Sequence, residues 1–477
     1  MKVVVWGSKR ELSFSRSFCR TLGYSGFFLL EACCVSVGCM WPKVFAPLLA
    51  FRHAPANKFP QLKLRLRQER SLTHKREISI PLSSFDPKSI DFAHREIPQG
   101  SVVEIRDADH HRLLALGFYE PSLLRVDVFH FSPKVVTDLP VISEEFFLDR
   151  MKGAWERRQR VFRHSENGST NAYRIVNGYA DGIPSLYVDL FSSGFARVVA
   201  TSTGAERIVP AVCELLRQRG VEEVLLDTPF LKGCEKVTFI TPTITLPQLY
   251  VESGASNLWL PRDVHPGTST NRWLLNTAHR RSRLLLRELC HGKRVLCVND
   301  RSGAAALQAA MVAKQVLVSE TDGPLLDRVR ENLVSNHGMA IFSTCETTNA
   351  GVDHVNPRRH DVVYLEHRSD DLSTQQQWGS MLRTLLRRGI CGNGSVLIAA
   401  QEVATLGIHD YAIPQSKNVG CSVPANREDI VNTFSGVAGE HGLSLRLLRF
   451  FGPSIDHPIM SYMDPACFSY VFLLQTK

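Results

Sequence analysis

A short polar turn carries the first side chains that could do chemistry. The stretch RVLCVNDRSGAAALQAA, residues 294–310, has the pattern of a buried strand, a turn and a helix of small residues. In an open parallel sheet, ligands bind where a strand ends and a helix begins, and glycine lets the backbone approach them closely. We therefore expect Ser302 and Gly303 to line a cofactor site, or the shell of one.

Acidic residues end two of the later apolar runs. Glu320 closes VLVSE, and Glu366 closes VVYLE. An acid at the end of the second strand of a nucleotide-binding sheet can accept hydrogen bonds from ribose hydroxyls. We expect this role for Glu320, and the alternative is a solvated glutamate at a strand end.

The elements that must position these residues alternate regularly after residue 270. VLCVN, QVLVSE, HDVVYLEH and SVLIAAQ are typical of strands, and the segments between them have helical spacing. LSLRLLRFF and FSYVFLLQT end the chain as two further strands. Continuous apolar strands that alternate with helices predict an α/β fold with a mostly parallel, doubly wound, Rossmann-like sheet.

The 477-residue chain is long enough for two or three domains. Short alternating runs between residues 62 and 133 predict a small β-barrel, and residues 146–164 predict a basic helix. A mixed α+β pattern follows from about residue 171 to 249. We expect four sections: a leader over 1–60, a barrel over 61–135, a basic helix with an α+β domain over 136–255, and the Rossmann-like domain over 256–477.

Several blocks together resemble a known family. LALGFYEPSLLRVDVF ends the predicted barrel, NAYRIVNGYADGIPSLYVDLF opens the central section, and DRVRENLVSNHG and IDHPIMSYMD follow in the last domain. From about Leu62 to the C-terminus, the chain resembles the large-subunit rRNA cytosine-5 methyltransferases of the PUA–SAM type. The resemblance implies a PUA β-barrel, a central α+β domain, a Rossmann-like methyltransferase domain, S-adenosylmethionine as cofactor and rRNA as partner.

The residues that would carry this chemistry depart from the family pattern. Its glycine-rich turn F-S-Y-T-G-G corresponds to NDRSGA, so Ala304 replaces the second glycine. Its Asp-Pro-Pro loop corresponds to Glu366, His367 and Arg368, and its cysteine nucleophile to Gln401 or Glu402. Because cytosine-5 transfer needs a thiolate that adds to the ring, the sequence predicts that this activity is lost.

Three functions stay open. The first is a non-catalytic RNA-binding protein that acts on rRNA, as a mitochondrial ribosome assembly factor, together with ribosomal or assembly proteins. The second is an active S-adenosylmethionine-dependent rRNA methyltransferase, with Ser302, Gly303, Glu320 and Glu346 at the cofactor and Glu366 orienting the base. The third is a protein-docking scaffold that uses the segment 410–428.

A net charge of +9, from 56 Lys and Arg against 47 Asp and Glu, favours a polyanionic partner. Affinity for RNA comes largely from Lys and Arg on phosphates, and basic residues recur in three clusters. The candidate RNA contacts are Lys63, Arg65, Arg67, Arg70, Lys75 and Arg76, then Arg157, Arg158 and Arg160, then Arg280 and Arg281. Phe118 and Tyr119 could stack on bases, but their alternating positions favour the barrel core.

The first 60 residues are rich in arginine, serine and apolar residues and contain only two acids, Glu11 and Glu31. This composition is typical of a mitochondrial transit peptide, and the alternative is a basic extension without a targeting role. The 12 cysteines contain no C-x-x-C pair, so we expect no structural metal and no disulfide framework. We expect no membrane contact.

Overall fold

The computed structural model describes residues 59–73, 77–109, 112–132, 140–163, 170–191, 194–227, 234–238, 249–252, 256–259, 276–300, 302–320, 323–336, 345–348, 359–366, 374–403, 427–458 and 466–477. Residues 1–58 of the predicted leader and residues 410–426 of the segment 410–428 lie outside the described part of the chain. Among the described residues, no helix has the length and apolar character that crossing a bilayer requires.

A five-stranded sheet forms the N-terminal part. Its order is β1 (Gln61–Lys63), β3 (Val102–Arg106), β4 (Leu113–Glu120), β5 (Arg125–Phe131) and β2 (Ser79–Pro81), with α3 (Glu69–Thr73) and α4 (Pro87–Glu96) beside it. Backbone bonds from Arg65 to Ser84 and from Asp86 to Lys63 join the segments that follow β1 and β2. The two edge strands therefore approach each other, as expected for a barrel-like sheet. Tyr119 is buried in the barrel core, as its alternation indicated. Phe118 is also fully buried, but on the other face of β4, where its ring stacks on Phe147 with the ring centroids 5.5 Å apart.

The central part is a second five-stranded sheet with two helices. Its order is β10 (Cys234–Thr238), β9 (Glu223–Asp227), β8 (Phe195–Ala200), β7 (Leu186–Phe191) and β6 (Ala172–Asn177), with α5 (Glu144–Arg163) and α6 (Thr203–Gln218). A separate two-stranded sheet follows, made of β11 (Leu249–Glu252) and β12 (Ser256–Trp259). Ser202 caps α6 by accepting from the N–H of Ala205 at 3.3 Å.

Glu120 joins the barrel to the central part. It ends β4, and its carboxylate accepts from the N–H groups of Thr203 and Gly204, at 3.3 and 2.6 Å, in the first turn of α6. These amides have no partner inside their own helix, so an acid from another domain satisfies them. Burial, and then the charge of Asp127, raises the pKa of Glu120 to about 7.

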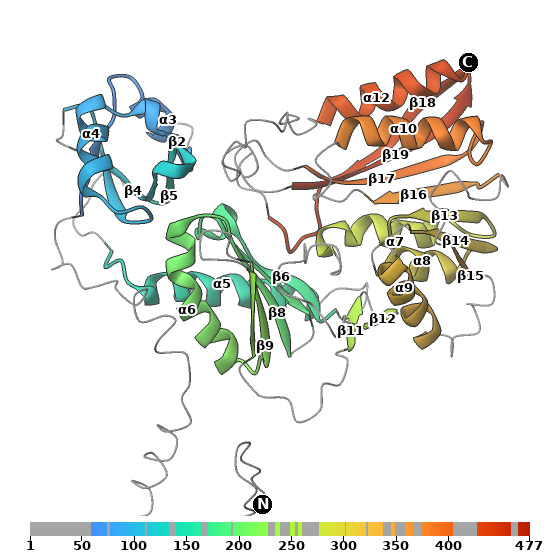
Figure 1. Cartoon of the computed structure of the whole chain (residues 1–477), viewed down its shortest axis with the longest axis horizontal. Helices are drawn as coiled ribbons and strands as arrows, with labels where there is room; N and C mark the ends of the chain where they lie inside the picture. The colour runs from blue at the N-terminus through green and yellow to red at the C-terminus, as the bar shows by residue number, and fades with distance from the viewer. Residues whose placement is uncertain are drawn as a thin grey trace, which may run out of the picture. The chain divides into compact units, whose positions relative to one another are not determined.

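A seven-stranded sheet forms the C-terminal part (Figure 1). Its order is β15 (Cys345–Thr348), β14 (Gln315–Ser319), β13 (Arg294–Val298), β16 (Val362–Glu366), β17 (Val396–Val403), β19 (Ala466–Thr476) and β18 (Leu443–Phe451). The ladders are parallel from β15 to β17, and β19 runs antiparallel to both of its neighbours. The α/β fold class is therefore confirmed, and β15 is a strand that the sequence did not predict.

Helices cover both faces of this sheet (Figure 1). One face packs on α7 (Arg280–Leu289), α8 (Ala304–Ala310) and α9 (Gly323–Ser335), and the other on α10 (Thr374–Arg387) and α12 (Arg427–Glu440). Val295 and Cys297 of β13 belong to the first core, and Leu296 and Val298 to the second. A strand buried on both sides explains the continuous apolar run.

Candidate functional site

The strand order reverses at β13, whose two neighbours are β14 and β16. In open α/β sheets, ligands bind beside the carboxyl ends of the strands at this switch point. The turn after β13 has two residues with positive φ, Asn299 at 58° and Gly303 at 74°. We call the carboxyl ends of β13, β14 and β16 the carboxyl edge, and its described residues form the candidate cofactor site.

Asp300 occupies the start of the helix that follows this turn. Its two carboxylate oxygens accept from the N–H groups of Ala305, at 3.2 Å, and Ala306, at 2.7 Å. Amides at a helix N-terminus are the groups that would receive an anionic part of a ligand. Here the side chain of Asp300 already occupies the amides of Ala305 and Ala306, so these two amides are not available to an anionic part of a ligand.

A second acid lies near Asp300. Glu366 ends β16, is buried, and accepts from the hydroxyl of Tyr364 at 3.1 Å. Burial, and then the charge of Glu366, raises the pKa of Asp300 to about 7, although Arg283 of α7 acts in the opposite direction. Arg283 is itself fully buried and donates to the carbonyl of Asn276 at 2.9 Å. The carboxyl edge therefore holds two buried acids and one buried arginine.

The structure brings most of the predicted cofactor residues to this edge. Ser302 is buried in the turn, and its carbonyl accepts from the Asn332 side chain at 2.8 Å. Glu320 is also buried, directly after β14. Glu346 differs, because its backbone pairs with Leu317 in the interior of β15 rather than at the strand end. Its side chain lies outside the described residues.

Gly303 has a structural reason to be glycine. Its left-handed φ of 74° is costly for other residues, and an added Cβ would meet the Cγ1 of Val329 at 3.1 Å. It directly precedes α8, which is buried along its whole length. The conformation of the turn and the packing of α9 thus account for this residue without a ligand.

No thiol lies at the carboxyl edge among the side chains that the structure describes. Strand β17 continues through Gln401 and Glu402, which pair with Phe468 and Cys467 of β19. Cys391 lies before β17 at the opposite end, and burial raises its pKa to about 12. The same described part of the chain contains no group of three or more His, Cys, Asp or Glu residues that could hold a metal ion.

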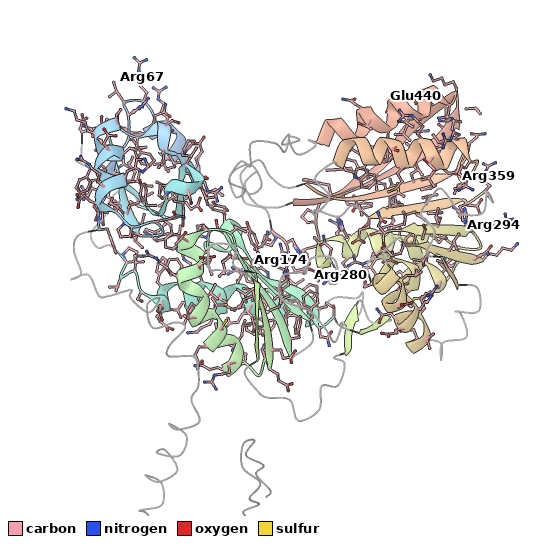
Figure 2. All side chains as sticks on the ribbon, in the orientation of Figure 1. Arg67, Arg174, Arg280, Arg294, Arg359 and Glu440 are labelled. Atoms are coloured by element: carbon pink, nitrogen blue, oxygen red, sulfur yellow. The ribbon has the colours of Figure 1, made fainter. Side chains whose placement is uncertain are left out.

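The basic residues of the barrel lie mainly at its surface. Arg65, Arg67 and Arg70 are exposed, and Lys63 is half-buried. Arg67 has a positive φ of 73° and points away from the barrel (Figure 2). Lys75 and Arg76 lie outside the described residues.

The other two basic clusters divide into exposed and buried members. Arg157, Arg160 and Arg281 are exposed. Arg158 and Arg280 are 4% and 5% exposed and form ion pairs inside the protein. We expected these two to contact RNA, but their guanidinium groups pair with Asp181 and Asp456 inside the protein. Arg158 and Arg280 are therefore no longer candidate RNA-binding residues.

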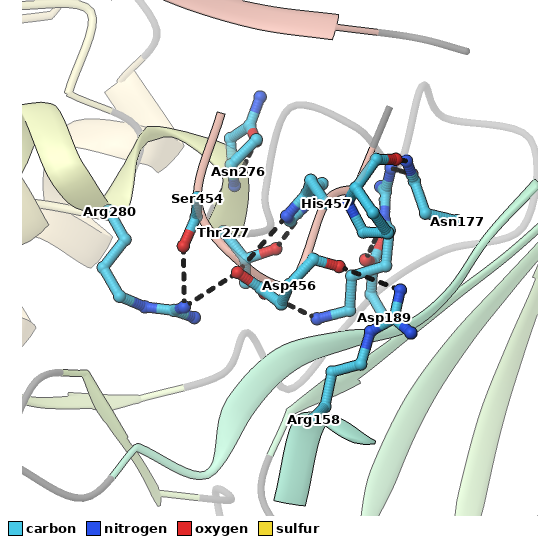
Figure 3. Close-up of polar contacts among 12 residues, drawn as sticks. Arg158, Asn177, Asp189, Asn276, Thr277, Arg280, Ser454, Asp456 and His457 are labelled. Carbon is cyan, nitrogen blue, oxygen red and sulfur yellow. Dashed lines mark hydrogen bonds and ion pairs between the residues drawn. The ribbon is translucent and has the colours of Figure 1, made fainter. Parts of the chain in front are cut away.

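The buried arginines belong to a network that joins the central part to the C-terminal domain (Figure 3). Asp456, between β18 and β19, accepts from Arg280 at 3.0 Å and from the backbone N–H of Arg174 at 2.9 Å. Arg158 forms two bonds to Asp181, at 2.7 and 2.6 Å, and reaches the carbonyl of Asp456. Burial raises the pKa of Asp456, but the charges of Arg280 and His457, together with hydrogen bonds from His457 and Ser454, outweigh burial and hold this pKa well below its usual range.

Sequence reasoning missed Asp300 and misjudged Arg158, and both left a local signal. Asp300 is an acid a few residues ahead of a helix of small residues, although the N-cap position itself is Gly303. Arg158 follows Phe147, Met151 and Ala154 at helical spacing, so it lies on the buried face of α5. Asp456 has no comparable signal, because its partner Arg280 is 176 residues away.

Comparisons with known proteins agree with this geometry. No protein-family model matches the chain. Ribosomal RNA large subunit methyltransferase I of Escherichia coli is 28% identical over 244 residues, which cover 50% of this chain and 58% of that protein. The protein of the same name from Yersinia pseudotuberculosis is 25% identical over 242 residues, with the same coverage. The chain thus spans a little over half the length of the curated relatives it matches.

Solved structures extend the likeness over more of the chain. A protein assigned as a SAM-dependent methyltransferase, from Streptococcus mutans, has a TM-score of 0.64 at 15% identity and covers 87% of this chain and 100% of its own. The fold is that of class I methyltransferases. SMU.776, assigned as a methyltransferase and solved in complex with SAH, has a TM-score of 0.65 at 14% identity, with the same coverage.

Proposed function

We propose that this protein binds ribosomal RNA and no longer methylates cytosine C5, and that it acts as an assembly factor of the mitochondrial ribosome. The observation that carries the proposal is the position of Asp300. Its carboxylate caps α8 at the switch point of the sheet, where the cofactor of a class I methyltransferase would need access to the same amides.

The catalytic step lacks its nucleophile. Cytosine-5 transfer requires a thiolate next to the base, and Gln401 and Glu402 stand where the related family has its cysteine. An amide or a carboxylate cannot form the same ring adduct and then leave. In a serine protease, loss of the nucleophilic serine lowers kcat by about a million-fold.

RNA is the partner that the remaining features favour. Exposed arginines occur on the barrel at Arg65, Arg67 and Arg70 and on α5 at Arg157 and Arg160. The curated relatives are named as ribosomal RNA methyltransferases. A protein that kept the RNA-binding body of such an enzyme could hold rRNA in an immature conformation. The basic, serine-rich leader is the reason to place this activity in the mitochondrion.

Two titrations test the proposal. Calorimetry with S-adenosylmethionine and with SAH should show no heat of binding, because Asp300 occupies the helix terminus. RNA binding should weaken as salt increases, and Arg67→Gln should lower the slope of log K against log salt by about 0.9 if Arg67 contacts a phosphate. Micromolar affinity for the cofactor contradicts the loss of the cofactor site, and salt-independent binding contradicts the RNA role.

The compartment and the target have their own measurement. We expect crosslinking and sequencing of the bound RNA in cells to recover mitochondrial rRNA. Recovery of cytosolic rRNA would contradict the mitochondrial assignment and leave the RNA-binding role standing. Removal of residues 1–58 should move a fluorescent fusion of the protein out of mitochondria.

An active RNA methyltransferase is the second candidate, and Glu320 favours it. This acid is fully buried at the end of β14, where it could accept from a ribose. The fold is also similar to a protein solved with SAH. The test is transfer of a labelled methyl group to rRNA from cells that lack this protein. Transfer that Glu320→Ala abolishes would support the enzyme and overturn our proposal.

A further inference from the structure

The opposite end of the seven-stranded sheet is strongly basic. In the described part of the chain, four connections lead into the parallel strands β13, β14, β16 and β17: residues 291–294, 311–315, 359–361 and 387–395. They contain six lysines and arginines and one acid, Asp361. We call these six cations the amino-edge rim: Lys293, Arg294, Lys314, Arg359, Arg387 and Arg388.

Hydrogen bonds fix these connections next to one another. The N–H of Lys314 donates to the carbonyl of Lys293 at 2.9 Å, and the N–H of Asp361 donates to the carbonyl of Arg294 at 2.9 Å. Arg359 donates to the carbonyl of Asn393 in the connection before β17. Neighbouring strands lie about 4.8 Å apart, so β14, β13 and β16 set these charges in a row across the sheet.

The rim is open to solvent. Arg294, Lys314, Arg359 and Arg387 are exposed, and Lys293 and Arg388 are half-buried. Figure 2 shows Arg294 and Arg359 directed outward at the same end of the domain. The one acid, Asp361, accepts from the backbone N–H of Arg294 at 2.9 Å. Its single negative charge stands against six positive charges, so the four connections keep a net positive charge of five.

We propose that the amino-edge rim binds the phosphate backbone of a structured RNA, at the end of the sheet that class I methyltransferases do not use for the cofactor. Arginine presents a planar fork of donors that matches phosphate, and a row of cations follows a chain of phosphates. No large exposed apolar residue among those described lies in the four connections. A protein partner would need such anchors, so nucleic acid fits the rim better.

This proposal rests on RNA being the partner under the proposed function, and it adds a second contact surface. RNA held by the barrel and α5 would have to reach the amino edge as well. The protein would then act as a clamp with two separate contacts, and each would contribute its own salt dependence.

The test compares two triple variants of the full-length protein on a defined rRNA stem-loop. The rim variant is Lys293→Gln, Arg294→Gln and Lys314→Gln. These three side chains were chosen because they are exposed or half-buried. The control variant is Arg330→Gln, Arg383→Gln and Arg446→Gln, which removes the same charge from exposed positions on other parts of the domain. We expect the rim variant to lower the log–log salt slope by about 0.9 for each phosphate that is no longer neutralised. The control variant should keep the wild-type slope.

The outcomes separate the two proposals. Salt-dependent binding by the wild type, with equal slopes for rim and control variants, overturns the rim and leaves the RNA role intact. No salt-dependent binding by the wild type overturns the RNA role itself. If the rim variant instead loses only its binding to phosphatidylglycerol vesicles, the rim serves a lipid surface and our inference is wrong.

Discussion

Two aspartates in the C-terminal part of the chain are equally buried and electrostatically opposite. Asp456 and Asp300 are each 1% exposed. The guanidinium of Arg280 lies 3.0 Å from Asp456, and together with His457 and Ser454 it outweighs burial and holds the pKa of that acid well below its usual range. Asp300 has amide donors and a neighbouring acid, Glu366, and its pKa is raised to about 7 by burial and by that acid.

The difference shows which region is built for stability. At the Asp456 network, the carboxylates of Asp456 and Asp181 each lie beside a buried arginine. At the carboxyl edge, two acids remain close together in a low-dielectric interior, which costs stability at neutral pH. Carboxyl groups whose pKa is raised by burial and by a neighbouring acid are characteristic of functional sites. The carboxyl edge thus has the electrostatic character of a functional site.

Removal of the Asp456 carboxylate should have the largest effect. Asp456→Ala leaves Arg280 buried without its counterion, and loss of one partner of a buried ion pair costs about 3–5 kcal/mol. Urea denaturation followed by circular dichroism measures this change. The low pKa makes the contribution present at neutral pH and lost only as the pH falls through the folded-state value. An unchanged midpoint at pH 7 would show that the network does not stabilise the junction.

Asp300→Asn should change how stability depends on pH. The folded pKa of about 7 lies above the unfolded value, so the wild type is relatively more stable below the unfolded pKa and loses stability as the pH rises toward 7. Asn does not titrate. The free energy of unfolding of the variant should therefore increase relative to that of the wild type between about pH 4 and pH 7, by at most about 1.4 kcal/mol per pH unit.

Glu366→Gln is the matched control for this titration. It removes one of the causes of the raised pKa, so the wild-type slope should become shallower without vanishing. The quantity to compare is the slope of the free energy of unfolding against pH rather than its absolute value. The side-chain NH2 group of Asn cannot accept from a helix amide, so the substitution also changes the absolute stability. Parallel pH profiles for wild type and Asp300→Asn would show that Asp300 is ionised throughout, contrary to our account.

Periodicity predicted the sheet, and long-range pairing decided the site. The apolar runs at 295–298 and 362–365 gave the right strands, and Glu320 and Glu366 follow or end strands at one edge, as expected. Charge alone could not separate Arg157, which is exposed, from Arg158, which is buried. That distinction depends on Asp181, which β6 and the turn after it bring under α5. The partners of Arg280 and Asp300 are likewise set by the tertiary fold.

Gly303→Ala should have a smaller effect, confined to the turn. A β-carbon in the left-handed region costs about 1–2 kcal/mol, and the contact with Val329 at 3.1 Å must also relax. Gly436→Ala in α12 is the control, because an added Cβ meets nothing there within 4 Å and alanine favours the helix. The midpoint of thermal unfolding should therefore fall for Gly303→Ala and rise for Gly436→Ala. A shift in the same direction would contradict the local account of Gly303.

The smallest effect should come from an exposed ion pair in the same domain. Arg383 of α10 donates to both carboxylate oxygens of Glu440 of α12, at 2.7 and 2.8 Å, a geometry as good as that of the buried pair. Both side chains are about half exposed, however, so water and salt screen the attraction. A double-mutant cycle with Arg383→Gln and Glu440→Gln should give a coupling energy that disappears in high salt.

The same cycle on Arg280 and Asp456 should keep its coupling energy when salt is added, because both groups are enclosed. If the two cycles respond equally to salt, burial does not control the strength of these pairs. The contrast between the network and the surface would then depend on hydrogen-bond number alone, since Asp456 also accepts from the backbone of Arg174.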